Sequence, residues 1–276
     1  MDREKLIKLA KELHQEAFDA NAYYLIMQQY RHFRKEYNDA MQLSPAFYQV
    51  VYEALQKACF MEIAKLYDKS SNVVTIGSLL KECQDNHSLF PEYRDTITVK
   101  DDGREYTFPV PYHHHLKPEE ECFFKAQVES QRKIFRIFDA PDPDSVPVQM
   151  DLTFSEFLEL YQKRFQSLSK KRENIRAQRN KIYAHNDVEH IMEDEIVYQR
   201  NPVTYPDIQE LIEFALDCTG LILGTLTDVC QATRYSNIDD WEGTLMLAQL
   251  GLKYKDYDLQ QREKKFWEEY YADKRE

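Results

Sequence analysis

Apolar residues recur three, four or seven positions apart after Thr153, which places them on one face of an α-helix. The stripe consists of Leu158, Tyr161, Phe165, Leu168, Ile175 and Ile182. Continuing its register puts Arg172 and Arg179 on the same face. Because an unpaired buried charge is unfavourable, we expect these two arginines to be paired, hydrated or directed toward a partner.

The low content of glycine and proline also favours long helices over a fold of strands and turns. Only six glycines and ten prolines occur in 276 residues. Apolar periodicity predicts further helices over residues 4–38, 44–68, 75–85, 204–234, 241–250 and 259–272. Pro45 and Thr75 are expected at the start of two of them, and Thr204 at the start of another. The helix after Thr204 is apolar on nearly all sides, so it should form the core.

Residues 87–150 interrupt the helical pattern. Thr96–Val99 and Tyr106–Val110 alternate in strand fashion around Asp102-Gly103, which predicts a β-hairpin. A helix is expected over residues 119–138. The sequence therefore predicts an all-α bundle of four to five long helices. It forms a single domain over residues 1–276, with an insertion at 87–150 and a C-terminal helical extension at 236–276.

Basic residues cluster in the last part of the long helix, although the whole chain has a formal net charge of -12. Between residues 162 and 181 the only acid is Glu173, and the basic residues are Lys163, Arg164, Lys170, Lys171, Arg172, Arg176, Arg179 and Lys181. This basic segment indicates a local anionic ligand. Two alternatives are a solvated helix face and pairing with the acidic patch at residues 187–195. The acidic balance argues against non-specific coating of nucleic acid.

The histidines His113–His115 do not predict a metal site. Three consecutive side chains cannot all point one way, and no Cys or acidic motif at ligand spacing accompanies them. We expect no metal and no cofactor. The five cysteines include no CxxC pair, the N-terminus has no apolar signal core, and the most apolar run (Leu211–Leu226) contains two acids. A cytoplasmic location without a membrane span is therefore expected.

The string Arg179-Asn180-Lys181-x-x-Ala184-His185-x-Asp187 stands near the end of the long helix. It resembles the AbiU-type abortive-infection branch of the HEPN superfamily, which is marked by an Arg, a polar residue, a short spacer and a His. A second, weaker match is Leu66-Tyr67-Asp68-Lys69, which singles out Asp68. The resemblance covers the helical parts of the chain and does not cover about 87–150.

This resemblance implies a HEPN-like bundle and a metal-independent endoribonuclease that acts as a toxin or phage-defence effector. In such an enzyme the 2'-hydroxyl of RNA attacks the adjacent phosphate by internal transesterification. His185 would act as general base or acid, because histidine titrates near neutral pH. Arg179 would clamp the phosphate with its planar donors, and Asn180 would orient the phosphate or the histidine.

The remaining expected site residues extend the motif. Arg172, Arg176, Lys181 and Tyr183 would contact RNA, and Asp68 and Asp187 would orient the catalytic side chains. The alternative for Asp68 is a turn after the helix that it holds by local backbone hydrogen bonds. On an ideal helix Arg179 and His185 differ in direction by about 120°, so one motif alone does not form a compact pocket. Related HEPN proteins dimerise so that two motifs face each other, which implies a two-fold homodimer here. An antitoxin of the nucleotidyltransferase type is a candidate partner.

Two other functions remain open at the level of the sequence. The first is a non-catalytic HEPN module that binds RNA, a nucleotide or a partner protein, because fold does not determine function. The second is a structural helical protein whose basic segment only neutralises its acidic patch. Full pairing of Arg179 within one subunit would favour this last alternative.

Overall fold

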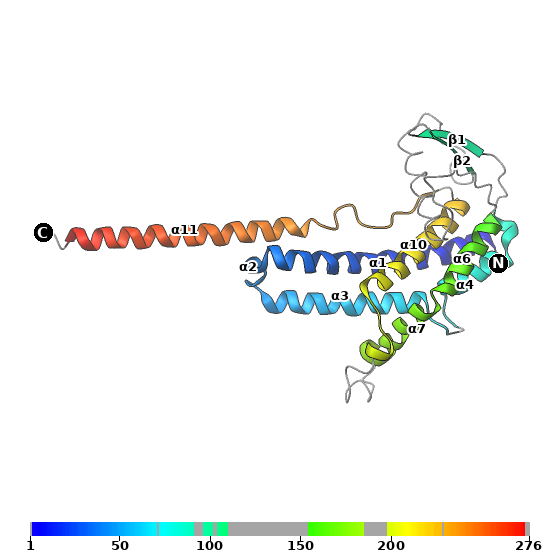
Figure 1. The fold of residues 1–276 in the computed structure, drawn as a ribbon, viewed down its shortest axis with the longest axis horizontal. Helices are drawn as coiled ribbons and strands as arrows, with labels where there is room; N and C mark the ends of the chain where they lie inside the picture. The colour runs from blue at the N-terminus through cyan, green and yellow to red at the C-terminus, as the bar shows by residue number, and fades with distance from the viewer. Residues whose placement is uncertain are drawn as a thin grey trace. The chain divides into compact units, whose positions relative to one another are not determined.

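The computed structural model describes residues 2–70, 72–90, 96–101, 104–109, 154–184, 198–227 and 229–273. The chain divides into two compact units, and Figure 1 labels their helices. Unit 1 comprises residues 1–20 and 60–233, and unit 2 comprises residues 21–59 and 234–276. Helices α1 (Arg3–Glu36) and α3 (Pro45–Leu66) contribute residues to both units. Helices account for most of the described residues, which confirms the all-α class.

Helix α10 (Tyr205–Thr227) forms the core of unit 1, as predicted. Thirteen of its 23 residues are buried, and its Phe214 ring packs against Tyr161 and Phe165. The helix ends at Thr227, whereas the apolar pattern predicted an end near Arg234. The hydroxyls of Thr225 and Thr227 donate to carbonyls four residues earlier. Such local hydrogen bonds slightly weaken a helix, although the same bond from Thr219 to the Ala215 carbonyl does not end it.

Polar caps begin two helices of unit 1 where the sequence predicts them. Helix α4 (Ile76–Asp85) begins with a reciprocal capping box between Thr75 and Ser78. Helix α10 begins in the same way, because the Thr204 amide donates to Asp207 Oδ2 and the Asp207 amide donates to Thr204 Oγ1. These caps satisfy amide groups that have no partner within the helix.

The predicted long helix after Thr153 is interrupted, so the expectation of one continuous helix was wrong. It consists of α6 (Phe154–Ser167), a turn at Leu168, α7 (Ser169–Gln178) and the π-helical segment η2 (Arg179–Ala184). At the turn, the Ser167 hydroxyl donates to the Arg164 carbonyl at 2.8 Å. This hydrogen bond competes with the helical ladder. The buried stripe nevertheless keeps its register through Leu158, Leu168 and Ile175.

The hairpin expected near Asp102-Gly103 is present in unit 1. Strands β1 (Thr96–Asp101) and β2 (Arg104–Pro109) pair antiparallel, with Asp101 opposite Arg104. The short helix η1 (His87–Leu89) precedes them. The helix expected at residues 119–138 and the histidines His113–His115 lie outside the described residues.

Unit 2 contains the second half of α1, α2 (Asn38–Met41), the start of α3, and α11 (Trp241–Asp273). Its buried cluster consists of Tyr30, Phe33, Tyr37, Ala40, Met41 and Leu245. Trp241 packs on Phe33 with 4.7 Å between ring centroids. The two predicted C-terminal helices are one helix, because the segment between them lacks proline and ion pairs such as Arg262–Asp258 support it.

None of the helices in the described part of the chain is both long and apolar enough to cross a membrane.

Candidate active site

Arg179 lies at the junction between α7 and the π-helical segment η2. Two amides anchor the end of α7 to the chain before α10. Asn174 Nδ2 donates to the Pro202 carbonyl at 2.7 Å, and Gln178 Nε2 donates to the Asn201 carbonyl at 2.6 Å. Ile175 is completely buried between them. The position of Arg179 is therefore set by a packed and hydrogen-bonded helix end. π-Helical turns are often found at functional sites.

The guanidinium of Arg179 is paired with Asp68, which follows the end of α3. Arg179 Nη2 donates to Asp68 Oδ2 at 2.7 Å, and both side chains are mostly buried. Arg179 Nε is buried and lacks a hydrogen-bond partner within the described residues. Arg179 is thus held in place without all of its donors being paired, and 21% of its side chain remains exposed.

Asp68 is itself held by the turn that follows α3. Its Oδ1 accepts hydrogen bonds from the Lys69 amide at 2.6 Å and from the Ser70 amide and hydroxyl at 3.0 Å each. Burial acts to raise the pKa of Asp68. The hydrogen bonds from Ser70, Lys69 and Arg179 outweigh burial and lower the pKa, so Asp68 is ionised near neutral pH.

Two neighbouring contacts fix this turn against the core and against α7. The buried Tyr67 hydroxyl donates to the Leu211 carbonyl at 2.5 Å, and burial raises the pKa of Tyr67 well above its usual value. Lys69 Nζ pairs with Glu173 Oε1 at 3.1 Å. Asp68 therefore pairs with Arg179, and the adjacent Lys69 pairs with Glu173. These two ion pairs join the turn after α3 to the long helical segment.

Arg172, expected to contact RNA, packs against an aromatic ring. Its Cζ atom lies 3.6 Å from the centroid of Phe165, which is a cation–π contact. Its Nε is buried without a hydrogen-bond partner among the described residues, and burial lowers the pKa of Arg172. Arg176 Nε donates to the Arg172 carbonyl at 3.2 Å. The two arginines of the apolar stripe, Arg172 and Arg179, are therefore both partly buried, and each has a buried Nε without a hydrogen-bond partner among the described residues.

Part of the basic segment is neutralised by α10. Arg164 and Lys171 both form ion pairs with Glu210, and Lys171 Nζ also lies 2.7 Å from Asp207 Oδ1. Sequence reasoning missed the pairing of the basic segment with Glu210 and Asp207. Lys171 and Glu210 are 39 positions apart, and a local pattern does not indicate contacts over such a separation. Lys163 and Lys170 remain exposed, so the positive surface that is open to a ligand is smaller than the sequence suggests.

The rest of the motif is described in part. Asn180 is exposed and Lys181 is half-buried, and both belong to η2, as does the backbone of Tyr183. His185, Asp187 and the acidic patch at residues 187–195 lie outside the described residues. The ideal α-helix assumed for this part of the motif was wrong, because Arg179–Ala184 is π-helical, with i→i+5 hydrogen bonds and more residues per turn.

The described residues contain no group of three or more His, Cys, Asp or Glu side chains that could hold a metal ion.

The all-α architecture, with Arg179 and Asn180 at the end of a long helical segment, agrees with the class expected from the sequence. The sequence model of the HEPN family AbiU2 matches residues 3–244. The chain therefore belongs to the AbiU2 family of the HEPN superfamily. No curated protein and no solved structure matches the chain.

Proposed function

We propose that this chain is a metal-independent endoribonuclease of the abortive-infection type, in which Arg179, Asn180 and His185 act on one RNA phosphate. The observation that carries the proposal is the state of Arg179. Its orientation is maintained by Asp68, while 21% of its side chain remains exposed. A guanidinium in this state is preorganised to stabilise the charge that develops on a phosphate in the transition state.

The reaction uses the RNA's own 2'-hydroxyl as nucleophile. His185 takes the proton from this hydroxyl or gives a proton to the leaving 5'-oxygen, since an imidazole exchanges protons near neutral pH. The bond from phosphorus to the leaving oxygen breaks as the bond to the 2'-oxygen forms. Arg179 neutralises the added negative charge, and Asn180 orients the phosphate or the histidine.

The other proposed residues act around this centre. Lys181 and Tyr183 contact the RNA beside Asn180, and Arg172 and Arg176 extend the positive path along α7. Asp68 positions Arg179, and Asp187 supports His185. Two copies of the motif face each other in a two-fold homodimer, and an antitoxin of the nucleotidyltransferase type restrains the activity in the cytoplasm.

The test is RNA cleavage by purified protein in the presence of EDTA. His185→Ala should lower the rate by about 10²- to 10⁴-fold, the usual loss when a general acid or base is removed. His87→Ala is the matched control, because His87 is an exposed histidine in the same unit and should leave the rate unchanged. Cleavage by His185→Ala at the wild-type rate, with contaminating nuclease excluded, would refute the catalytic assignment.

A second candidate is a non-catalytic module that binds RNA, a nucleotide or a partner protein. The observation in its favour is that the Asp68 carboxylate already neutralises much of the Arg179 charge. This candidate predicts RNA binding without cleavage, and a binding constant that His185→Ala leaves unchanged.

A further inference from the structure

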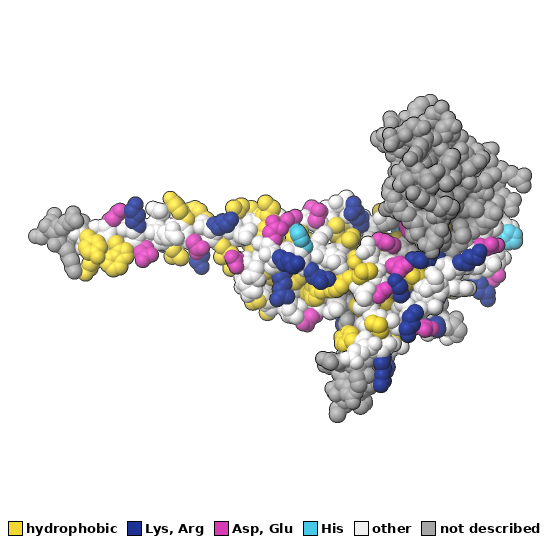
Figure 2. Space-filling view, viewed as in Figure 1, with side chains coloured by type: hydrophobic (Ala, Val, Ile, Leu, Met, Phe, Trp, Pro, Cys, Tyr) yellow, Lys and Arg dark blue, Asp and Glu magenta, His cyan; other side chains and the backbone are white. Residues whose placement is uncertain are grey.

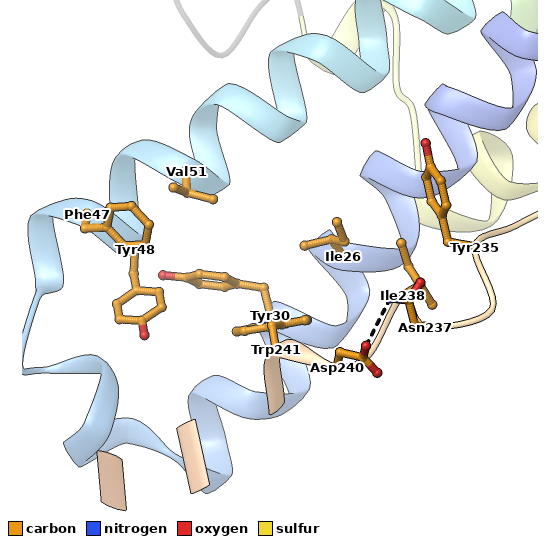
Figure 3. A pocket seen from close by; sticks show the side chains of 10 residues that line it. All are labelled: Ile26, Tyr30, Phe47, Tyr48, Val51, Tyr235, Asn237, Ile238, Asp240 and Trp241. Carbon is orange, nitrogen blue, oxygen red and sulfur yellow. Dashed lines mark hydrogen bonds between the residues drawn. The ribbon is translucent and has the colours of Figure 1, made fainter. Parts of the chain in front are cut away.

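Unit 2 contains an open pocket of about 480 Å³ that is lined mainly by aromatic and aliphatic side chains. Its walls come from three segments: Tyr30 on α1, Phe47 and Tyr48 at the start of α3, and the chain from Tyr235 to Trp241. Figure 3 shows Tyr48 beside Tyr30, and their ring centroids lie 6.1 Å apart. Pockets of this size and composition bind apolar or aromatic groups.

Part of the pocket wall is exposed although it is apolar, whereas Tyr30 is buried. Phe47 is 63% exposed. The one charged residue in the lining is Asp240, whose Oδ2 accepts a hydrogen bond from Asn237 Nδ2 at 3.0 Å, drawn as a dashed line in Figure 3. The lining therefore favours an apolar or aromatic occupant over an anionic one.

An exposed aromatic cluster lies at the other end of α11. We call Phe266, Trp267, Tyr270 and Tyr271 the distal cluster, and their rings contact one another at centroid distances of 5.4–6.3 Å. Phe266 is 59% exposed and Trp267 is 45% exposed. Figure 2 shows these side chains as a group of hydrophobic atoms near the C-terminal end of the helix. Exposed aromatic groups of this extent indicate an interaction surface.

The distal cluster shares a helical face with the part of α11 that is already packed. Leu245 is buried in the core of unit 2, and Leu252, Leu259 and Phe266 follow it at intervals of seven residues. A spacing of seven drifts by only about 20° on an α-helix, so these residues lie on one face. The first turns of this face pack against α2, whereas Leu259 and Phe266 are exposed.

The distal cluster cannot enter the pocket of its own chain. Tyr270 follows Trp241 by 29 positions in one continuous helix, which separates them by about 44 Å along the axis. A second copy of the chain can bring its distal cluster to this pocket. When two α11 helices lie antiparallel, the end of each is brought next to the start of the other, so both pockets can be filled by one two-fold operation.

The charge of α11 also favours a second copy. Between Lys253 and Tyr271 there are five basic and five acidic residues, so this segment has no net charge although the chain has a net charge of -12. Intrahelical pairs such as Arg262–Asp258 and Lys265–Glu269 satisfy several of these charges. A neutral helix does not repel its own copy, and it lacks the excess of basic residues that nucleic acid would select.

We propose that the distal cluster of one copy binds in the aromatic pocket of a second copy, through antiparallel pairing of their α11 helices. The contact area is sufficient for a stable dimer. A buried aromatic side chain covers about 150–250 Å². The four side chains of each distal cluster are 41–59% exposed, so about half of this area is free to be covered, and both clusters with the pocket walls that cover them reach the roughly 1,200 Å² typical of stable interfaces. This interface is independent of RNA cleavage, and the distal cluster follows the residues matched by the AbiU2 family.

The first test is the molar mass of the full chain by light scattering during gel filtration. Phe266→Asp should halve the mass, because it places a charge on the side chain that enters the apolar pocket. Phe47→Asp should also halve the mass, because it places a charge in the pocket wall. Halving is expected when α11 pairing alone joins the copies, or when it joins two dimers that meet at Arg179; when both contacts lie in one dimer, the cross-link below decides. Gln261→Asp is the matched control, since it adds the same charge to an exposed position on the opposite side of α11. Circular dichroism should show equal helix content in all variants.

The second test locates the contact by cross-linking. Protein with Phe47→Cys is mixed with protein carrying Trp267→Cys, both in a background with Cys122→Ser and Cys230→Ser, and a short thiol cross-linker is added. The three remaining native cysteines are buried. A covalent heterodimer is expected from this mixture and from neither variant alone. Phe47→Cys mixed with Gln261→Cys is the matched control and should give no heterodimer.

Two outcomes would overturn the proposal. The first is an unchanged mass for Phe266→Asp together with no covalent adduct between positions 47 and 267. The second is a halved mass without a covalent adduct between positions 47 and 267. RNA cleavage measured in parallel reports separately on the ribonuclease function.

Discussion

Arg179 Nη2 donates a hydrogen bond to Asp68 Oδ2 at 2.7 Å, although the two residues are 111 positions apart in the chain. Asp68 is in turn oriented by the Lys69 and Ser70 amides, and Tyr67 fixes the same turn to the core helix α10. The guanidinium is therefore positioned by a chain of contacts that ends in the most buried helix of unit 1. Such support is what a phosphate-binding arginine needs to remain in one orientation without its ligand.

Asp68→Asn should lower RNA cleavage by about 10²-fold, because a displacement of roughly 1 Å in a catalytic group can cost that much. The loss should be in kcat, since Arg179 keeps its charge and can still attract RNA. The matched control is Glu173→Gln, which removes the exposed neighbouring ion pair with Lys69 and leaves Arg179 untouched. Faster cleavage by Asp68→Asn would show that Asp68 competes with the phosphate for Arg179.

Arg179→Lys should restore little of the activity that Arg179→Ala removes. Lysine keeps the positive charge and can still pair with Asp68, but it lacks the planar paired donors that match a phosphate. Single-turnover cleavage rates of the two variants provide the comparison. Lys163→Ala is the control further up the helical segment; it should alter only RNA affinity and its salt dependence. Equal rates for Arg179→Lys and wild type would mean that only a point charge is required.

The features that the sequence predicts correctly are those encoded by local pattern. Thr75 and Thr204 cap the helices that they were expected to cap, and α10 is the core helix because its apolar residues occupy nearly every side. The partial burial of Arg172 and Arg179 also follows from their place on the stripe. Asp68 was singled out only by the family resemblance, since nothing in its own neighbourhood indicates an arginine partner.

The features that the sequence does not predict depend on tertiary contacts or on small differences in backbone energy. The ion pairs of Lys171 and Arg164 with Glu210 join two helices that are distant in sequence. The turn at Leu168 keeps the same apolar stripe as a straight helix, and the π-helical segment after Gln178 is too short for its different period to show in the pattern, so periodicity reveals neither. The aromatic pocket of unit 2 combines three separated segments, none of which has a distinctive motif.

Gly77→Ala should destabilise the protein by about 1–3 kcal/mol, the usual cost of overpacking. A Cβ atom at Gly77 would lie 2.8 Å from Phe165 Cζ, so the ring that supports the Arg172 guanidinium must move. Urea unfolding provides the measurement. Gly220→Ala is a control that should change the free energy of unfolding in the opposite direction. An added Cβ there meets nothing within 4 Å, and alanine inside a helix should stabilise by about 0.5–1 kcal/mol. A neutral Gly77→Ala would show that the Phe165 ring adjusts freely.

The stability of unit 1 should fall as the pH drops below about 6.5, because of His14. This buried residue joins α1 to α10: its Nδ1 lies 2.8 Å from Thr219 Oγ1, and its Nε2 lies 2.9 Å from the Ala232 carbonyl oxygen. The carbonyl can only accept, so in the neutral ring Nε2 carries the proton, and Nδ1 faces the Thr219 hydroxyl, which also lies 2.7 Å from the Ala215 carbonyl oxygen. Burial lowers the pKa of His14, and the hydrogen bond to Ala232 opposes this effect only in part.

The sign of the effect follows from this lowered pKa. The unfolded chain binds a proton near pH 6.5, whereas the folded chain binds it only at lower pH. The stabilisation is therefore complete above about pH 6.5 and is lost as the pH falls toward the folded-state pKa, with a slope of at most about 1.4 kcal/mol per pH unit. Urea unfolding between about pH 5.5 and 7.5 should show this slope in the wild type and in His87→Gln, and His14→Gln should remove it. A slope that persists in His14→Gln would assign the pH dependence to another group.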